Sequence, residues 1–251
     1  IFSLPRNPNL ILEESVNELS TLIEESIRLM IKDRIIEGES ISILFSGGLD
    51  STVIAFFILK AVDDKQRVEL INVFSNDKAH DKLASENSFK DLKVLFPSRN
   101  LFFVSKTARL EETELLKEEV MNLIAPLQTE MDLNISSLLK KAVEKHPDST
   151  SKVVFSGLGA DELFCGYSRY KNSFNSGGFE KIDQEMKLDQ KRLWLRNLGR
   201  DDRIISSESC ELRTPFITRN LFEFANKLPF SHLLNLVSGE NKIVLRRLAH
   251  K

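Results

Sequence analysis

Apolar residues follow two different spacings along the first 165 residues of the chain. Short apolar runs indicate buried strands, and longer stretches with an apolar residue every three or four positions indicate helices. The predicted strands are 41–45, 69–74, 101–104 and 152–155, and the predicted helices are 13–37, 52–62, 83–95, 109–123 and 134–144. Strands separated by helices of this length predict an α/β fold with a parallel sheet and right-handed crossovers.

The chain after residue 165 has a different pattern. No strand signal remains there, helical patterns dominate to the end, and Ser173–Gly178 is expected to form a loop. We therefore expect an α/β core over residues 1–165 and a helical part over residues 166–251. A chain of 251 residues is long enough to bury a large core.

The composition weighs against some classes of protein. Lys and Arg number 35 and Asp and Glu number 37, so no strongly basic face for nucleic acid is expected. No apolar run is long enough to span a bilayer and no signal peptide is visible, so a cytoplasmic protein is expected. The cysteines Cys165 and Cys210 form no metal motif and no disulfide framework, and we expect both to be packing thiols.

The strongest chemical signal is the sequence SGGLDS at residues 46–51, which lies between the strand 41–45 and an apolar helix. The first N–H groups of a helix have no partner within the helix, and the helix dipole favours an anion there. Gly47 and Gly48 allow the backbone to approach a phosphate closely. Asp50 would repel phosphate unless a magnesium ion lies between them. The loop therefore predicts a pyrophosphate site.

Other readings of this loop are possible. It lacks the Gly-Lys-Ser/Thr ending of the Walker loop, it is not a GxGxxG sequence, and it could be a surface turn of small residues. SGGLDS resembles the loop of the ATP pyrophosphatases, which cleave ATP to AMP and pyrophosphate. The loop alone does not choose among the members of that group.

A second glycine-rich stretch, SGLGADELFCGY at residues 156–167, follows the strand 152–155. In a parallel sheet two such strand ends can be neighbours, and ligands bind at that edge. Asp50 and Asp161 are therefore expected to converge on one magnesium ion. The alternative is that Asp161 and Glu162 only stabilise a helix N-terminus.

Four ordered motifs resemble the asparagine synthetase family. Besides SGGLDS, the stretch 156–167 resembles its SGEGxDExFGGY motif, ELRTPF (211–216) resembles ExRxPF, and KIVLR (242–246) resembles KxxLR. Together the motifs cover residues 46–246. Four further stretches resemble a divergent branch of the family: AHDKL (79–83), FPSR (96–99), LIAPL (123–127) and RNLGRDDR (196–203).

This resemblance implies an ATP-pyrophosphatase-type fold and an ATP-dependent amide ligase of the glutamine-hydrolysing asparagine synthase type. The aspartate carboxylate would attack the α-phosphate of ATP, pyrophosphate would leave, and ammonia would then displace AMP. The implied nucleotide-binding residues are Leu44, Ser46, Gly47, Gly48, Asp50, Ser51, Phe74, Ser156 and Gly157. The implied magnesium ligands are Asp50 and Asp161, and the implied catalytic residues are Lys242, Arg200 and Glu162. For Lys242 the plain alternative is a solvated lysine on a helix.

The sequence departs from the family pattern at the acceptor side. The motif Glu of SGEG is Leu158, an Asp upstream of ExRxPF is Asn197, and the Asp of PFLD is Thr218. A Thr-Thr-x-Arg stretch is not visible around residues 128–137. Leucine cannot accept a proton or hold an ammonium ion, so the acceptor and the amidation step stay open. A ligase with another acceptor and an ATP-binding pseudoenzyme acting as an interaction module are the two rival hypotheses.

The family also carries an N-terminal glutaminase domain with a nucleophilic Cys as its first residue. Nothing in these 251 residues resembles that domain. The resemblance implies a glutaminase domain upstream of Ile1 in the full-length protein, or the use of free ammonia. The expected partners are an amino-acid acceptor and ammonia.

Overall fold

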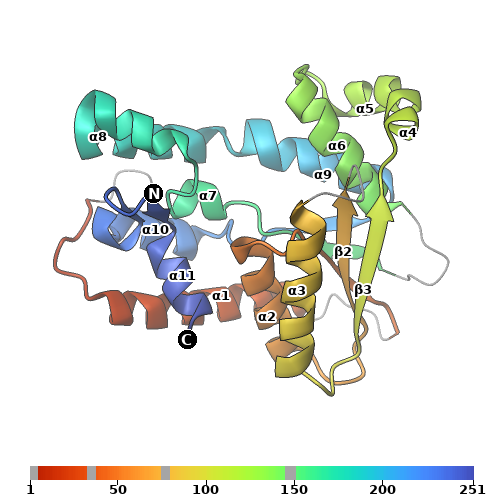
Figure 1. The fold of residues 1–251 in the computed structure, drawn as a ribbon, viewed down its shortest axis with the longest axis horizontal. Coiled ribbons are helices and arrows are strands. Elements are labelled where there is room, and N and C mark those ends of the chain that lie inside the picture. Colours follow the sequence, from red (N-terminus) through yellow and green to blue (C-terminus); the bar gives the residue numbers. More distant parts are fainter. Residues whose placement is uncertain (1–4, 33–37, 75–79, 145–150) are drawn as a thin grey trace. The chain divides into compact units, whose positions relative to one another are not determined.

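The computed structural model, drawn in Figure 1, describes residues 5–32, 38–74, 80–144 and 151–251. The chain divides into two compact units. The sheet unit comprises Met30–Gly157 and Leu195–Arg213, and the helical unit comprises Ile1–Leu29, Leu158–Trp194 and Thr214–Lys251. This division does not coincide with the expected boundary at residue 165, because the N-terminal helix groups with the C-terminal part. Within the helical unit, the Ser26 hydroxyl of the N-terminal helix donates to the Pro215 carbonyl of the C-terminal part at 2.8 Å.

The sheet unit contains five parallel strands in the order β3-β2-β1-β4-β5, which confirms the predicted parallel α/β fold. The strands are β1 (Ile41–Leu44), β2 (Val68–Phe74), β3 (Leu101–Thr107), β4 (Val153–Phe155) and β5 (Glu211–Arg213). The chain moves outward from β1 through β2 to β3 and then returns to place β4 on the other side of β1. The topological switch point, where open α/β sheets bind ligands, therefore lies between β1 and β4.

Strand β5 corrects the prediction that no strand follows residue 165. Its three residues pair with Val153–Phe155 in parallel register. Unlike β4, it has no apolar run, because Glu211 and Arg213 flank a single leucine, so only the pairing with β4 defines the strand. A second small sheet was also missed, the antiparallel pair β6 (Leu234–Asn235) and β7 (Glu240–Asn241) of the helical unit.

The helices of the sheet unit follow the predicted periodicity with one break. They are α2 (Leu49–Ala61), α3 (His80–Leu95), α4 (Leu110–Leu115), α5 (Lys117–Ile124), α6 (Glu130–Val143) and α9 (Gly199–Ser207). The single helix predicted over 109–123 is two helices that meet at Leu116. Figure 1 shows α6 beside α9, and these two helices pack against each other. Val143 of α6, Val154 of β4 and Ile205 of α9 form one buried apolar cluster.

The helical unit is built around α1 (Leu12–Ile31), α7 (Ala160–Leu163), α8 (Arg169–Arg192), α10 (Arg219–Lys227) and α11 (Ile243–Ala249). The apolar face predicted for the first helix is buried at Val16, Leu19, Ile23 and Ile27. Residues 33–37 of that prediction lie outside the described residues. Trp194–Leu198 is a π-helix and Phe230–His232 is a 3₁₀-helix.

The prediction of a loop over Ser173–Gly178 is wrong for most of its length. Residues 173–176 belong to α8, and only Gly177 and Gly178 have non-helical dihedral angles, so the helix is kinked there. Phe174 and Phe179 pack edge to face across this kink with ring centroids 5.0 Å apart. The predicted loop is therefore confined to the two glycines.

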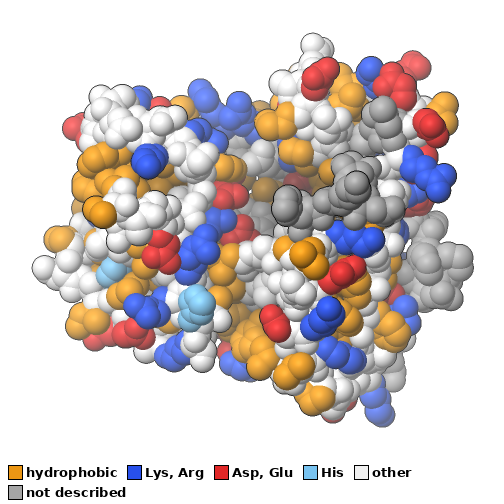
Figure 2. All heavy atoms as spheres, viewed as in Figure 1, with side chains coloured by type: hydrophobic (Ala, Val, Ile, Leu, Met, Phe, Trp, Pro, Cys, Tyr) orange, Lys and Arg blue, Asp and Glu red, His pale blue; other side chains and the backbone are white. Residues whose placement is uncertain are grey.

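The helices and the surface charges bear on the class of protein. No helix in the described part of the chain combines the length and apolar character needed to cross a membrane. Figure 2 shows that Lys and Arg side chains are interspersed with Asp and Glu side chains on the face drawn.

Candidate active site

The glycine-rich turn joins β1 to α2, as predicted, but α2 begins at Leu49 rather than at Thr52, so the last three residues of SGGLDS form the first turn of the helix. The serines hold this segment together. The Ser46 hydroxyl accepts from the Gly48 N–H at 3.3 Å and lies 3.3 Å from the Ser51 hydroxyl. The Ser51 hydroxyl donates to the Gly48 carbonyl at 3.2 Å. Gly48 is the N-cap of α2, so the exposed turn presents the N-terminus of that helix.

Gly47 is required by the packing of the loop on α3. Its φ is +75°, and a Cβ there would lie 2.3 Å from the backbone of Ser85. The Ser88 hydroxyl also donates to the Gly47 carbonyl at 2.9 Å. In contrast, a Cβ on Gly48 would approach only the Ser46 hydroxyl, at 3.3 Å. The loop is thus closed toward α3 and open at Gly48, an arrangement that fits a pyrophosphate group.

Asn72 is a supporting residue that the sequence analysis missed. Its side chain, on β2, is only 2% exposed, and its amide donates to the Phe45 carbonyl at 3.0 Å. It therefore fixes the residue that precedes the loop. The available signal was an amide side chain within the apolar run of residues 70–74, where a buried polar group needs a partner.

The second strand end lies against the first, as predicted. The Ser156 N–H donates to the Arg213 carbonyl at 2.9 Å, which places it at the end of β4. A Cβ on Gly157 would lie 2.9 Å from the Asp50 Cβ and 3.1 Å from the Ser51 nitrogen. Only glycine allows the chain leaving β4 to pass this close to the loop.

Leu44 and Phe74 lie at the ends of β1 and β2. Leu44 is half-buried and packs against the cluster of Val143, Val154 and Ile205. Phe74 is 5% exposed, and the Lys82 ammonium lies 4.8 Å from its ring centroid. Both side chains belong to the same unit as the loop, and their contact with adenine stays a prediction.

In the helical unit, Lys242 forms an ion pair with Asp161 of α7. Its Nζ lies 2.7 Å from Asp161 Oδ1, and Lys242 is only 8% exposed. Lys242 is also not within a helix, because it is the N-cap of α11. The alternative of a solvated helix lysine is therefore wrong.

Glu162 is buried beside this pair. It is 2% exposed, and one carboxylate oxygen accepts from the Tyr167 hydroxyl at 2.6 Å. Burial raises the pKa of the Glu162 carboxyl above its ordinary value, although the Tyr167 hydrogen bond opposes the shift. The Gln190 side chain donates to the Glu162 carbonyl at 3.1 Å and ties α7 to α8.

Arg200 occupies a buried ionic cluster in the sheet unit. Its guanidinium contacts Asp132 of α6 and Asp201, each at 2.8 Å, and the residue is 4% exposed. Burial raises the pKa of Asp201 to about 6, against the effect of the Arg200 charge. Because two carboxylates enclose the guanidinium, the geometry favours a structural role in joining α6 to α9 over the catalytic role that the resemblance implied.

The two predicted magnesium ligands belong to different units, Asp50 to the sheet unit and Asp161 to the helical unit. Their convergence on one ion stays a prediction. Within the described residues there is no group of three or more His, Cys, Asp or Glu side chains suited to a metal. Magnesium sites that use one or two carboxylates together with phosphate oxygens do not need such a group.

The residues that depart from the family pattern have varied surroundings. Thr218 is the N-cap of α10, where its hydroxyl accepts from the Leu221 N–H at 3.4 Å. Asn197 lies in the π-helix, and Leu158 is half-buried.

The packing roles predicted for the cysteines are confirmed. Cys165 and Cys210 are both free, and burial raises the pKa of the Cys165 thiol to about 12.

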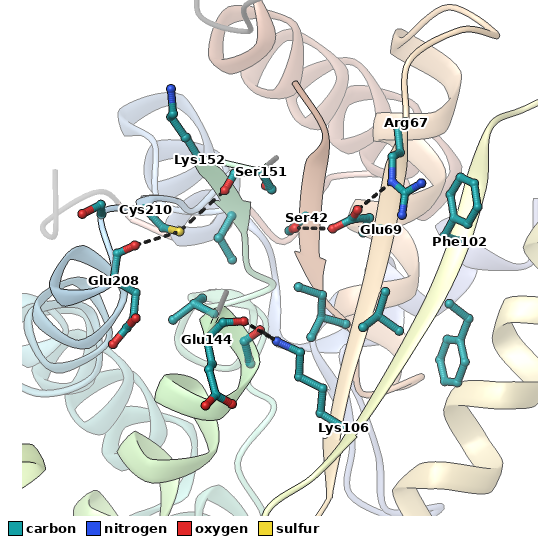
Figure 3. A pocket seen from close by; sticks show the side chains of 17 residues that line it. Ser42, Arg67, Glu69, Phe102, Lys106, Glu144, Ser151, Lys152, Glu208 and Cys210 are labelled. Atoms are coloured by element: carbon teal, nitrogen blue, oxygen red, sulfur yellow. Dashed lines mark hydrogen bonds and ion pairs between the residues drawn. The ribbon is translucent and has the colours of Figure 1, made fainter. Parts of the chain in front are cut away.

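A cavity of about 600 Å³ in the sheet unit contains none of the predicted site residues (Figure 3). Its charged groups have partners of their own. Arg67 lies 2.7 Å from the buried Glu69, and Lys106 donates to the carbonyls of Ala142 and Glu144 at 2.8 and 2.7 Å. This cavity is therefore separate from the motif-bearing strand ends, and we assign it no part in the chemistry.

The five-stranded parallel sheet, with its glycine-rich turn after β1, defines the fold of the PP-loop ATP pyrophosphatases. The family model for asparagine synthase matches residues 22–182 and 174–251. The chain therefore belongs to the asparagine synthase family, which confirms the resemblance seen in the motifs.

Individual relatives agree with this assignment. Asparagine synthetase domain-containing protein 1 of Homo sapiens is 31% identical, over 84% of this chain and 42% of its own length. A putative glutamine-hydrolyzing asparagine synthetase of Methanocaldococcus jannaschii is 29% identical over 92% of this chain and 40% of its own length. The glutamine-hydrolyzing asparagine synthetase of Mus musculus is 29% identical over 88% of this chain. The chain spans about two fifths of the length of these relatives.

Proposed function

We propose that this domain binds ATP with magnesium and uses it to activate a carboxylate, with release of pyrophosphate. The observation that supports this most is the close approach of Gly157 to the SGGLDS loop at the topological switch point of the sheet. Two glycine-bearing strand ends in contact there leave exposed backbone for an anion.

The proposed roles are those that the family resemblance implies for each residue. Ser46, Gly47, Gly48 and Ser51 hold the pyrophosphate part of ATP, while Leu44, Phe74, Ser156 and Gly157 contact the nucleoside and α-phosphate. Asp50 and Asp161 are the proposed magnesium ligands. A bound magnesium ion would neutralise phosphate charge. Lys242 supplies a positive charge for the transition state, and Glu162 is the proposed catalytic carboxyl beside it.

Aspartate is the proposed acceptor, because the relatives are named as asparagine synthetases. Its side-chain carboxylate attacks the α-phosphorus of ATP, the bond to the bridging oxygen breaks, and pyrophosphate leaves. Ammonia then attacks the carbonyl carbon of the resulting acyl adenylate, loses a proton, and AMP leaves with asparagine as the product. Alignment of the two reactants contributes most to such a step.

The second half of this reaction has weaker support in this chain. Leu158 stands where the family motif has a Glu, and it can neither accept a proton nor hold ammonium. Thr218 stands where the motif has an Asp, and its hydroxyl caps α10. These departures favour a second candidate function, activation of a carboxylate with slow or different onward transfer. A domain that binds ATP without turnover is the remaining alternative.

We extend the proposal to the source of ammonia. Two of the relatives are named as glutamine-hydrolyzing, and the chain spans only about two fifths of their length. A glutaminase domain in the full-length protein would supply ammonia to this domain.

Product analysis tests the proposed function. The domain is incubated with ATP, magnesium, aspartate and ammonium, and AMP, pyrophosphate and asparagine are quantified together. Equal amounts of the three products support the complete reaction. Pyrophosphate without asparagine supports the second candidate, and binding of ATP with no product supports the pseudoenzyme. Replacing aspartate with other carboxylic amino acids identifies the acceptor.

A further inference from the structure

Lys242 has a backbone conformation that residues other than glycine rarely adopt. Its φ and ψ are 54° and 36°, in the left-handed region. Such a conformation persists where the surrounding structure holds it, and it is frequent at functional sites. The question is which neighbours hold Lys242 so that its ammonium reaches Asp161.

Asn241 is the first of these neighbours. It ends the β6–β7 hairpin, where it pairs with Leu234. Its side-chain amide donates to the Gly166 carbonyl at 2.6 Å. A Cβ on Gly166 would lie 1.9 Å from Asp161 Oδ1 and 2.2 Å from Lys242 Cε, so the ion pair packs directly on this glycine. Asn241 therefore joins the segment that carries Lys242 to the segment on which the ion pair rests.

Arg246, one helical turn after Lys242, is the second neighbour. Its Nε donates to the Asn241 carbonyl at 2.8 Å, and its Nη2 donates to Asn241 Oδ1 at 3.1 Å. One planar guanidinium thus fixes both the backbone and the side chain of the residue before Lys242. The Ile243 N–H donates to the Leu233 carbonyl at 3.2 Å and holds the residue after Lys242.

From these contacts we propose that Arg246 and Asn241 are positioning residues for Lys242. They hold it in the left-handed conformation and so direct its ammonium to Asp161. This proposal rests on the proposed function for its effect on catalysis. The contacts among Arg246, Asn241, Gly166 and Lys242 do not depend on which acceptor is used.

The kinetic test compares R246A and N241A with R247A. Arg247 is the next residue of α11, it is exposed, and its only ion pair in the described residues is a 3.8 Å contact with Glu13, so R247A is a matched control. In ATP–pyrophosphate exchange we expect R246A and N241A to lower kcat by about 100-fold, the loss that a displacement of about 1 Å can cause. The KM for ATP should change much less, and R247A should leave both unchanged. R246K keeps the charge but not the paired donors, so its kcat should lie between those of the wild type and R246A.

A double substitution separates positioning from general damage. If Arg246 acts through Lys242, then R246A should cost nothing further in a K242A background. An R246A protein with the wild-type kcat, or a loss that persists undiminished in the K242A background, would overturn the proposal. Melting curves for every variant identify any loss that comes from unfolding.

A chemical readout keeps the test independent of the proposed function. The rate at which an acetylating ester modifies Lys242 is measured by peptide mass spectrometry in the wild-type and variant proteins. We expect Lys242 to be protected in the wild type and R247A, because it is buried and paired, and to lose that protection in R246A and N241A. Protection that is unchanged in R246A and N241A contradicts the positioning role. A wild type that is protected but shows no exchange contradicts the proposed function alone.

Discussion

Gly157 lies against Asp50, so closely that a Cβ on residue 157 would be 2.9 Å from the Asp50 Cβ. The end of β4 therefore limits where the only carboxylate of the SGGLDS loop can lie. Asp50 is in the first turn of α2, where an acidic side chain is favoured by the helix dipole. The same residue is the proposed magnesium ligand of the loop.

Asp50→Asn should weaken magnesium-dependent ATP binding without unfolding the protein. The amide keeps the shape of the side chain but loses the negative charge that a magnesium ion requires. The lost interaction with the helix dipole should reduce the free energy of unfolding by about 1 kcal/mol or less. Calorimetric titration with ATP, with and without magnesium, measures the effect, and an unchanged affinity for magnesium-ATP would remove Asp50 from the metal site.

Arg200→Ala should destabilise the protein strongly, because it leaves Asp132 and Asp201 buried without their cation. Removing one member of a buried ionic cluster costs about 3–5 kcal/mol. Urea denaturation measures this loss. Arg219→Ala is the control, since the pair that Arg219 forms with Glu223 is exposed on the Arg219 side and should be worth less than about 1 kcal/mol. An R200A protein of normal stability that has lost pyrophosphate exchange would instead support a catalytic role.

The stability of the protein should fall on acidification partly because of His232. This residue is 6% exposed, its Nδ1 has no hydrogen-bond partner in the described residues, and burial lowers its pKa. Below about pH 6.5 the unfolded chain binds a proton that the folded imidazole resists, so the His232 contribution is complete above that pH and is lost as the pH falls. His232→Gln should therefore show a smaller drop in Tm between pH 7.5 and 5.5. Identical drops in the two proteins would show that His232 does not contribute.

Leu158→Glu should increase ammonia-dependent formation of the amide. A positioned acid or base is worth roughly 100- to 10,000-fold, and the leucine can supply neither function. Asparagine and AMP are measured for the wild-type and variant proteins under the same conditions. If the wild type already forms asparagine as fast as it releases pyrophosphate, the leucine at position 158 does not limit amidation.

The sequence predicted the central strands of the sheet well because each is a short, almost continuous apolar run. Parallel strands buried on both faces have this pattern, as Ile41–Leu44 and Val68–Phe74 do. Strand β5 could not be found in this way, because Glu211–Arg213 is a strand only through its pairing with β4. The turn of helix at 173–176 was missed because its polar residues and the following glycines are typical of a loop, although only Gly177 and Gly178 are non-helical.

In the candidate site too, positions set by local structure were predictable and those set by long-range contacts were not. Motif residues next to a strand end, such as Gly47 and Asp50, lie where the sequence placed them, because a strand-to-helix turn is a local structure. Arg200 could not be assigned from the sequence, because its partner Asp132 is 68 residues away. Asn241 was missed because its contact, the Gly166 carbonyl, is 75 residues away. Contacts of this range are set by the tertiary structure.

ATP–pyrophosphate exchange is the most direct assay for carboxylate activation by this domain, because it requires that step but not amidation. The wild-type domain is incubated with ATP, magnesium, labelled pyrophosphate and aspartate. We expect label to enter ATP only when both magnesium and an acceptor carboxylate are present, and to enter much more slowly, but still measurably, in the K242A protein. Binding of ATP without incorporation of label, for aspartate and every other carboxylate tried, would contradict the account.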